Sequence, residues 1–163
     1  MTYLRTFILC LPILFAAVIA NAQGAKVAFG TIAADPTLPV EVTADGLDVN
    51  QSDGTAVFTG DVLIGQGEMR LSAQRVLVIY NQEEGGIKRL VASGGVTLVS
   101  GPDAAEADKA DYTIKSGVIV MTGNVLLTQG QNAMTSQQMT INLITGTANM
   151  AGRVKTILKT AKD

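Results

Sequence analysis

Beyond residue 40, apolar and polar residues alternate with a period of two, a pattern typical of β-strands with one buried face. The alternation is clearest around Gly60, Gly94, Gly123 and Gly152. Residues two before and two after each glycine are apolar, whereas the odd offsets are mixed and more polar. This pattern predicts that each glycine lies on the buried face. There the missing side chain would let another backbone, a bend or a ligand come close.

The glycines mark an internal repeat. They lie 34, 29 and 29 residues apart, and a second series of small residues is interleaved with them: Ala44, Ala73, Ala107 and Ser136. Each glycine is 13 residues before the next small residue, and each small residue is 16 residues before the next glycine. The one exception is the step of 21 residues from Ala73 to Gly94. A polar five-residue insertion at 82–86, predicted to form a hairpin tip, explains it. The chain therefore contains four copies of one structural unit.

The apolar series changes phase after each small residue. Residues two before it are apolar, but the next apolar residues come three and five after it, for example Val76 and Val78 after Ala73. An odd step would turn the side chains to the other face of the strand. A β-bulge or corner repeated in all four units would keep them inward. The same offsets give Leu47 and Val49, Ala110 and Tyr112, and Met139 and Ile141.

Turn residues separate the predicted strands, and no segment has a convincing helical period. The turns are expected at 52–54, 65–67, 116–117, 130–132 and 145–146. The pattern predicts an all-β jelly-roll or solenoid of about a dozen short strands in four stacked units. In such a stack the first and last units have open edges.

The first 22 residues have the features of a secretory signal peptide. Arg5 precedes an apolar run over residues 7–19, and Ala20-Asn21-Ala22 forms a small-x-small cleavage site before Gln23. A run of this length is too short for a spanning helix, which needs about 20 residues. We expect a cleaved signal peptide at 1–22, a lead-in segment at 23–39 with a possible short strand at 27–32, the repeat domain at 40–158, and a polar tail at 159–163.

Composition limits the functions that the chain can have. After cleavage, 11 basic residues stand against 14 acidic ones, so the basic field that nucleic-acid binding requires is missing. The sequence has no histidine, and its single cysteine, Cys10, lies in the signal peptide, where lipid attachment is not expected because Leu9 precedes it. Imidazole bases, thiol nucleophiles and the usual zinc ligand sets are therefore absent from the mature sequence.

The densest group of carboxylates lies in the third unit, at Asp103, Glu106, Asp108 and Asp111. Paired carboxylates could serve a glycan-cleaving enzyme, but these are expected to be solvated residues of a turn and an edge strand. The spacing of a calcium-binding loop, with its defined glycine, is also missing. We predict no enzymatic activity, no metal site and no cofactor.

The inward-facing apolar residues are the candidate binding site. Most of them are expected to pack as an ordinary core, while some could line a groove for acyl chains, because methionine and aliphatic side chains adapt to an irregular ligand. The candidates are Phe58, Val62, Ile64, Met69, Leu71, Val76, Val78, Val96, Leu98, Ile119, Met121, Val125, Leu127, Met134, Met139, Ile141 and Met150.

The repeated motifs resemble those of the LptA/OstA-like periplasmic lipopolysaccharide-transport family. The resemblance covers residues 40–158 and is carried by the runs Val42-Thr43-Ala44-Asp45, Phe58-Thr59-Gly60-Asp61-Val62 and Met121-Thr122-Gly123-Asn124-Val125. The family implies an OstA-like antiparallel β-jelly-roll, open at both ends, that holds the lipid A acyl chains of lipopolysaccharide inside and works in the periplasm for outer-membrane assembly. Two features depart from the family pattern. They are the insertion at 82–86 and the polar third unit, which would interrupt the groove or leave its rim charged.

The family also implies partners. These are an inner-membrane-anchored jelly-roll component and an outer-membrane barrel component of the lipopolysaccharide-transport machine, together with head-to-tail stacking of like domains. Open terminal edges would provide the means, because unpaired strands add further strands. The alternative hypothesis is that the protein is a structural, self-stacking β-solenoid with a dry core and no lipid ligand.

Overall fold

The computed structural model describes residues 25–28 and 35–158. Strands make up most of this part, and none of its helices is long and apolar enough to cross a membrane. The strands are β1 (Ala25–Ala28), β2 (Glu41–Thr43), β3 (Gly46–Asn50), β4 (Thr55–Gln66), β5 (Met69–Tyr80), β6 (Ile87–Ser100), β7 (Asp103–Thr113), β8 (Val118–Gln129), β9 (Asn132–Asn142), β10 (Thr147–Ala151) and β11 (Lys155–Ile157), with a 3₁₀-helix, η1 (Ile114–Ser116), between β7 and β8. The predicted signal peptide and residues 159–163 of the tail lie outside the described residues.

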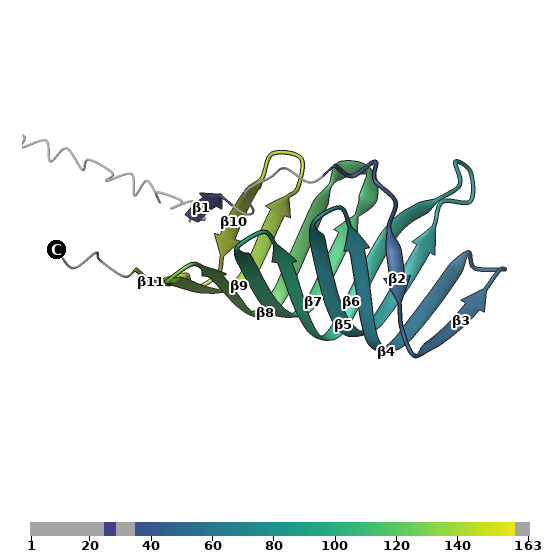
Figure 1. The fold of residues 1–163 in the computed structure, drawn as a ribbon, viewed down its shortest axis with the longest axis horizontal. Helices are drawn as coiled ribbons and strands as arrows, with labels where there is room; N and C mark the ends of the chain where they lie inside the picture. The colour runs from purple at the N-terminus through teal and green to yellow at the C-terminus, as the bar shows by residue number, and fades with distance from the viewer. Residues whose placement is uncertain (1–24, 29–34, 159–163) are drawn as a thin grey trace, which may run out of the picture.

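Every strand pairing is antiparallel, as the alternation predicts. The sheet order is β1-β10-β9-β8-β7-β6-β5-β4-β2, with β3 also paired to β4 and β11 to β9. Figure 1 shows β1, β10 and β11 at one end of the stack and β2 and β3 at the other. The antiparallel all-β jelly-roll expected from the sequence is confirmed.

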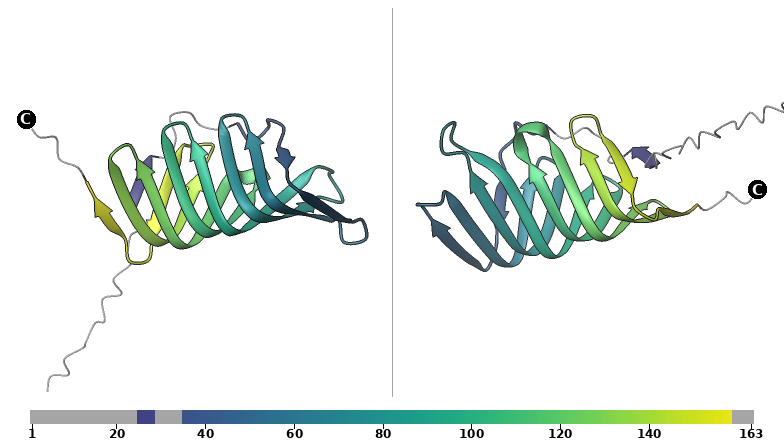
Figure 2. Two further views of the ribbon diagram at one scale, coloured as in Figure 1. Left: turned by 60° about the horizontal axis from the view of Figure 1, so that its bottom comes forward. Right: turned by 180° about the vertical axis from the view of Figure 1, so that it is seen from behind.

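A corner near the middle of each long strand divides the sheet into two layers. Layer A holds β2, β11 and the segments 62–66, 69–73, 96–100, 103–107, 125–129 and 132–136; layer B holds β1, β3, β10 and the segments 55–59, 75–80, 87–93, 109–113, 118–122 and 138–142. Figure 2 shows the bent strands stacked side by side along the molecule. Because they run through the corner, β4 to β9 are 11 to 14 residues long rather than short.

Two successive residues with positive φ make the corner in β4, β6 and β8 and again between β10 and β11. The φ angles of Gly60, Gly94, Gly123 and Gly152 are +77°, +88°, +80° and +77°, and the next residue in each case is also in the positive region. In β4, β6 and β8 the pair lies opposite a single residue of a neighbouring strand, which is a β-bulge. The predicted corner is confirmed. The glycines themselves are exposed or half-buried, so their placement on the buried face was wrong, because the left-handed turn carries them out of the pleat.

A side chain from the preceding strand packs over each corner glycine. A Cβ atom at Gly123 would lie 2.3 Å from Oδ2 of Asp108, and one at Gly94 would lie 2.8 Å from Cβ of Gln74. Each covering residue directly follows one of the repeated small residues, as Gln74 follows Ala73. The two repeated features of the sequence therefore meet in one contact. The corner glycine lacks a side chain, and this leaves room for the side chain that follows the repeated small residue.

The ends of the stack differ from the sequence prediction. Leu47 and Val49 were expected inside but are 54% and 62% exposed, because among the described strands β3 has only β4 as a neighbour.

Two further expectations concern the third unit and the lead-in segment. The acidic third unit was expected in a turn and an edge strand, yet β7 lies between β6 and β8. The lead-in strand was expected at 27–32; the structure has β1 at Ala25–Ala28, and residues 29–34 lie outside the described part.

The corner predicts a sharp difference between two adjacent glycines. Gly94→Ala should lower the free energy of unfolding in urea by about 2–4 kcal/mol, because alanine disfavours positive φ and its Cβ would clash with Gln74. Gly95→Asn is the matched control. Its φ is +82° with nothing within 4 Å, and asparagine occupies the equivalent position 124, so the loss should stay within about 1 kcal/mol. Equal losses would contradict this account of the corner.

Candidate functional site

The two layers enclose one apolar interior, which is the candidate site. All but one of the candidate binding residues named from the sequence are at most 6% exposed; the exception, Phe58, is partly buried and packs against the core. The buried ones are Val62, Ile64, Met69, Leu71, Val76, Val78, Val96, Leu98, Ile119, Met121, Val125, Leu127, Met134, Met139, Ile141 and Met150. Their inward orientation is thus confirmed, while their role in binding lipid stays a prediction.

Methionines line one part of this interior. Met139 pairs with Met121 on one side and with Met150 on the other, so three thioether side chains lie in a row across β8, β9 and β10, each fully buried. Unbranched, polarizable side chains repack more easily than branched ones. This end of layer B is therefore the wall of the interior best able to change shape around a ligand.

A hydrogen bond joins the two layers on the side away from the corners. Gln66 ends β4 in layer A and is 1% exposed, and its Oε1 accepts a hydrogen bond from the Tyr112 hydroxyl of layer B at 2.6 Å. The Gln66 amide also donates from Nε2 to the carbonyl oxygens of Pro36 and Leu38, at 3.1 and 3.0 Å. One buried side chain thus holds layer B and the lead-in segment together.

Gln66 was not predicted from the sequence, because a glutamine between two glycines resembles an exposed turn. One feature of the sequence did indicate that Gln66 is buried. It lies six residues after Gly60, and residues at even offsets from this glycine face the interior. The same offset gives Ser100, which is 6% exposed, and Gln129. We call Gln66, Ser100 and Gln129 the polar lip of layer A.

Gln129 makes a second attachment to the lead-in segment. Its Nε2 donates to the carbonyl oxygen of Ala28 at 2.7 Å and to Oδ2 of Asp103 at 2.9 Å. Asp103, only 8% exposed, is thereby part of the same edge of layer A. On the side opposite the corners, the interior is thus bordered by polar groups that also hold the chain preceding β2.

The other acidic residues of the third unit point away from the interior. Asp111 pairs with Arg89, Asp108 covers Gly123, and Glu106 is exposed. Toward the interior the unit instead presents the buried residues Ala105, Ala107, Ala110 and Tyr112. The polar third unit was expected either to interrupt the groove or to leave its rim charged. The structure has the second arrangement, with Asp103 at the rim.

Burial changes the ionisation of Tyr112. Desolvation raises the pKa of its hydroxyl to about 12, and the hydrogen bond to Gln66 opposes part of this rise. The neutral hydroxyl, which is the form that can donate to Gln66, therefore persists well above neutral pH.

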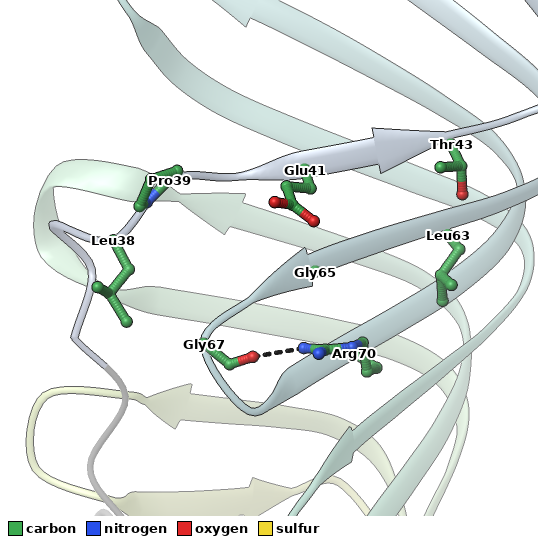
Figure 3. A pocket seen from close by; sticks show the side chains of 8 residues that line it. All are labelled: Leu38, Pro39, Glu41, Thr43, Leu63, Gly65, Gly67 and Arg70. Atoms are coloured by element: carbon green, nitrogen blue, oxygen red, sulfur yellow. Dashed lines mark hydrogen bonds between the residues drawn. The ribbon is translucent and has the colours of Figure 1, made fainter.

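Outside the interior, an open groove of about 360 Å³ lies on the outer face beside the edge strand β2. Figure 3 shows its lining, with Arg70 donating a hydrogen bond to the carbonyl oxygen of Gly67 and with Leu38 and Leu63 as apolar walls. Both leucines are more than 40% exposed. Among the described residues no group of three or more His, Cys, Asp or Glu side chains is placed to hold a metal ion.

The chain is similar to known proteins along most of its length. A family model described as "LptA/(LptD N-terminal domain) LPS transport protein" matches residues 41–147. An uncharacterized protein of Rhizobium meliloti is 29% identical over 128 residues, covering 72% of this chain and 69% of that protein. The lipopolysaccharide export system protein LptA of Haemophilus influenzae is 23% identical over 135 residues, covering 76% and 78%.

Two comparisons involve Pseudomonas aeruginosa. Its lipopolysaccharide export system protein LptH is 30% identical over 89 residues, which is 55% of this chain and 48% of that protein. The crystal structure of LptH, described as the LptA homologous periplasmic component of the lipopolysaccharide transport device, superposes with a TM-score of 0.70. It covers 78% of this chain and 99% of the other at 16% identity. This structural match shows the shared fold.

The bond between the layers predicts an alkaline weakening of the fold. Tyrosine with a folded pKa near 12 and an unfolded value of 10.0 stabilises the protein fully below pH 10, and that contribution, about 2–3 kcal/mol, disappears as the pH rises toward 12. Tyr112→Phe should flatten this part of the urea-unfolding profile. It should also cost about 1–3 kcal/mol at pH 8 by leaving Oε1 of Gln66 without its donor. Tyr80→Phe, at an exposed tyrosine, is the control and should change neither. A Tyr112→Phe profile parallel to that of the wild type would refute the role of this hydroxyl.

Proposed function

The chain belongs to the LptA/(LptD N-terminal domain) family of LPS transport proteins, and we propose that it is a periplasmic bridge module that carries lipopolysaccharide from the inner to the outer membrane. The observation that carries the proposal is the continuous apolar interior, formed by the same face of every repeat unit. The chemistry offered is binding and transfer of a lipid, with no bond made or broken.

The interior suits acyl chains in both composition and energy. Burying a hydrocarbon chain contributes about 0.8 kcal/mol per methylene, so a dozen methylenes supply roughly 10 kcal/mol before losses. Because the inward side chains are already almost fully buried, lipid entry requires the layers to separate. The chain crosses between the layers at the corners, so separation is easiest at the polar lip, where Gln66 and Gln129 hold the opposite side closed. The methionine row would then repack against the lipid.

The two ends suit the partners that the family implies. β2 and β3 form one end, and β11 forms part of the other, with exposed Leu47, Val49, Ile157 and Leu158 beside them. Edge strands with exposed apolar side chains pair readily with another sheet. We propose an inner-membrane-anchored jelly-roll and the periplasmic part of an outer-membrane barrel as neighbours, with copies of this chain between them. The predicted signal peptide, cleaved after Ala22, would deliver the protein to the periplasm.

One observation favours the alternative, a self-stacking structural solenoid. Apart from Phe58, the candidate binding residues of both layers are at most 6% exposed, as expected of a core that needs no ligand. The two functions differ in whether the interior takes up lipid, and two experiments separate them.

The first experiment uses a photo-crosslinking amino acid at adjacent positions of β4. Ile64 is 1% exposed and faces the interior, whereas Leu63 is 44% exposed and faces out. Residue 64 should label lipopolysaccharide at least tenfold more than residue 63, because only the inner face would contact acyl chains. Equal labelling, or none at residue 64, would exclude the interior as the lipid site.

The second experiment introduces a charge into the same strand on its two faces. Val125→Asp, at a residue 1% exposed, should abolish the one-to-one mass shift by lipopolysaccharide in native mass spectrometry, because an unpaired buried carboxylate opposes apolar contact. Thr128→Asp on the exposed face of β8 should leave the shift intact. Circular dichroism of both variants checks that they fold. A folded Val125→Asp protein that still takes up lipid would exclude the interior as the lipid site, and a wild-type protein that shows no mass shift would support the structural alternative.

A further inference from the structure

Strand β1 occupies a particular place at the end of the stack. It pairs antiparallel with β10, with Ala25 opposite Met150 and Val27 opposite Ala148. Met150 and Ala148 face the interior, so β1 continues layer B by one strand. Its last residue is also held by Gln129, through the carbonyl oxygen of Ala28.

The internal repeat predicts what should lie beside β10 if the stack continued. In every unit the residue two before the corner glycine pairs with the residue three after the next small residue, as in Phe58 with Val76 and Met121 with Met139. Met150 lies two before Gly152, the fourth corner glycine, and its partner on the side away from β9 is Ala25 of β1 among the described residues. The first unit of a second copy has Ala44 as its small residue. The same pairing pattern, called the repeat rule from here on, would place that copy's Leu47 opposite Met150 and its Val49 opposite Ala148.

β1 already holds these two positions. Ala25 stands opposite Met150, where the second copy's Leu47 would pair, and Val27 stands opposite Ala148, where its Val49 would pair. One residue separates the two positions in both strands. The strand direction also matches. β1 runs antiparallel to β10, just as β3 runs antiparallel to its own neighbour, β4. Strand β3 of a second copy and β1 of this chain would therefore compete for the same position at the edge of β10.

On the layer A side of the same end, the described part of the chain supplies no such strand. There β11 pairs only with β9, and its last residue, Ile157, is 59% exposed. The repeat rule pairs Val154 with the second copy's Ala44 and Thr156 with its Val42, which would add β2 antiparallel to β11. Layer A can thus accept a second copy as it stands, while layer B cannot.

We propose that β1 is an intramolecular stand-in for β3 of a second copy, and that end-to-end association requires β1 to leave the edge of β10. This rests on the bridge function proposed above. A second copy would offer leucine in place of Ala25 and valine again in place of Val27. It would also bury Leu47 and Val49, which are more than half exposed in the single chain. Cleavage after Ala22 would leave β1 two residues from the new N-terminus, where a four-residue strand is easily displaced.

The test locks β1 in place with a disulfide. Lys26 and Asn149 are register partners on β1 and β10, at a spacing that antiparallel neighbours offer to a disulfide, and the mature chain has no cysteine of its own. The variant Lys26→Cys/Asn149→Cys locks β1 when oxidised. The control Thr140→Cys/Asn149→Cys joins β9 to β10 and leaves β1 free. Sedimentation velocity of residues 23–163 measures association of each variant, oxidised and reduced.

The oxidised lock should associate at least tenfold more weakly than the oxidised control, and reduction should remove the difference. Val27→Asp, which weakens β1, should associate more strongly than the wild type. Equal association of lock and control would overturn the proposal, and so would a control and a Val27→Asp variant that both stay monomeric. Lipopolysaccharide labelling through residue 64, measured in the same samples, reports on the lipid-binding function separately. Retained labelling with equal association would refute only the role of β1.

Discussion

A corner made by two successive left-handed residues is the constraint on which the rest of this structure depends. Positive φ at Gly94 and at the residue after it lets one strand gain a residue over its neighbour without turning its inward side chains outward. Because every long strand has its corner at the same level, the bends align and one continuous sheet becomes two layers. The contact of Asp108 over Gly123 shows why the repeat needs glycine there and a polar residue on the strand before it.

The corner also determines how the interior can be used. Both walls are apolar, but the long strands β4 to β9 cross between them on one side only. On the other side Gln66 and Tyr112 close the gap with a hydrogen bond, and Gln129 holds the lead-in segment. Hydrogen bonds between neutral side chains contribute about 1 kcal/mol each, far less than the burial of an acyl chain. An enclosure of this kind is stable when empty and can still be opened by a lipid.

A stack of bent strands cannot close on itself, so it has two ends. Within residues 25–28 and 35–158, the bent strand formed by β2 and β3 has no outer neighbour at one end. At the other end, the bent strand formed by β10 and β11 has none in layer A. The same physical property serves a bridge, because each end can extend the sheet of the next domain. The presence of β1 at one of these edges makes the two layers unequal, which an ideal repeat would not be.

The sequence alone determined the repeat, the β-strand period, the recurring corner and nearly all of the inward-facing residues, because alternation and spacing are local properties of the chain. It misplaced the corner glycines, since a period of two cannot show that the backbone turns left-handed at Gly60. It also missed Gln66, whose role depends on Tyr112, a partner 46 residues away on the other layer. The exposure of Leu47 and the position of β1 were likewise decided only by the tertiary structure, because they depend on which strand ends the stack and not on the pattern within a unit.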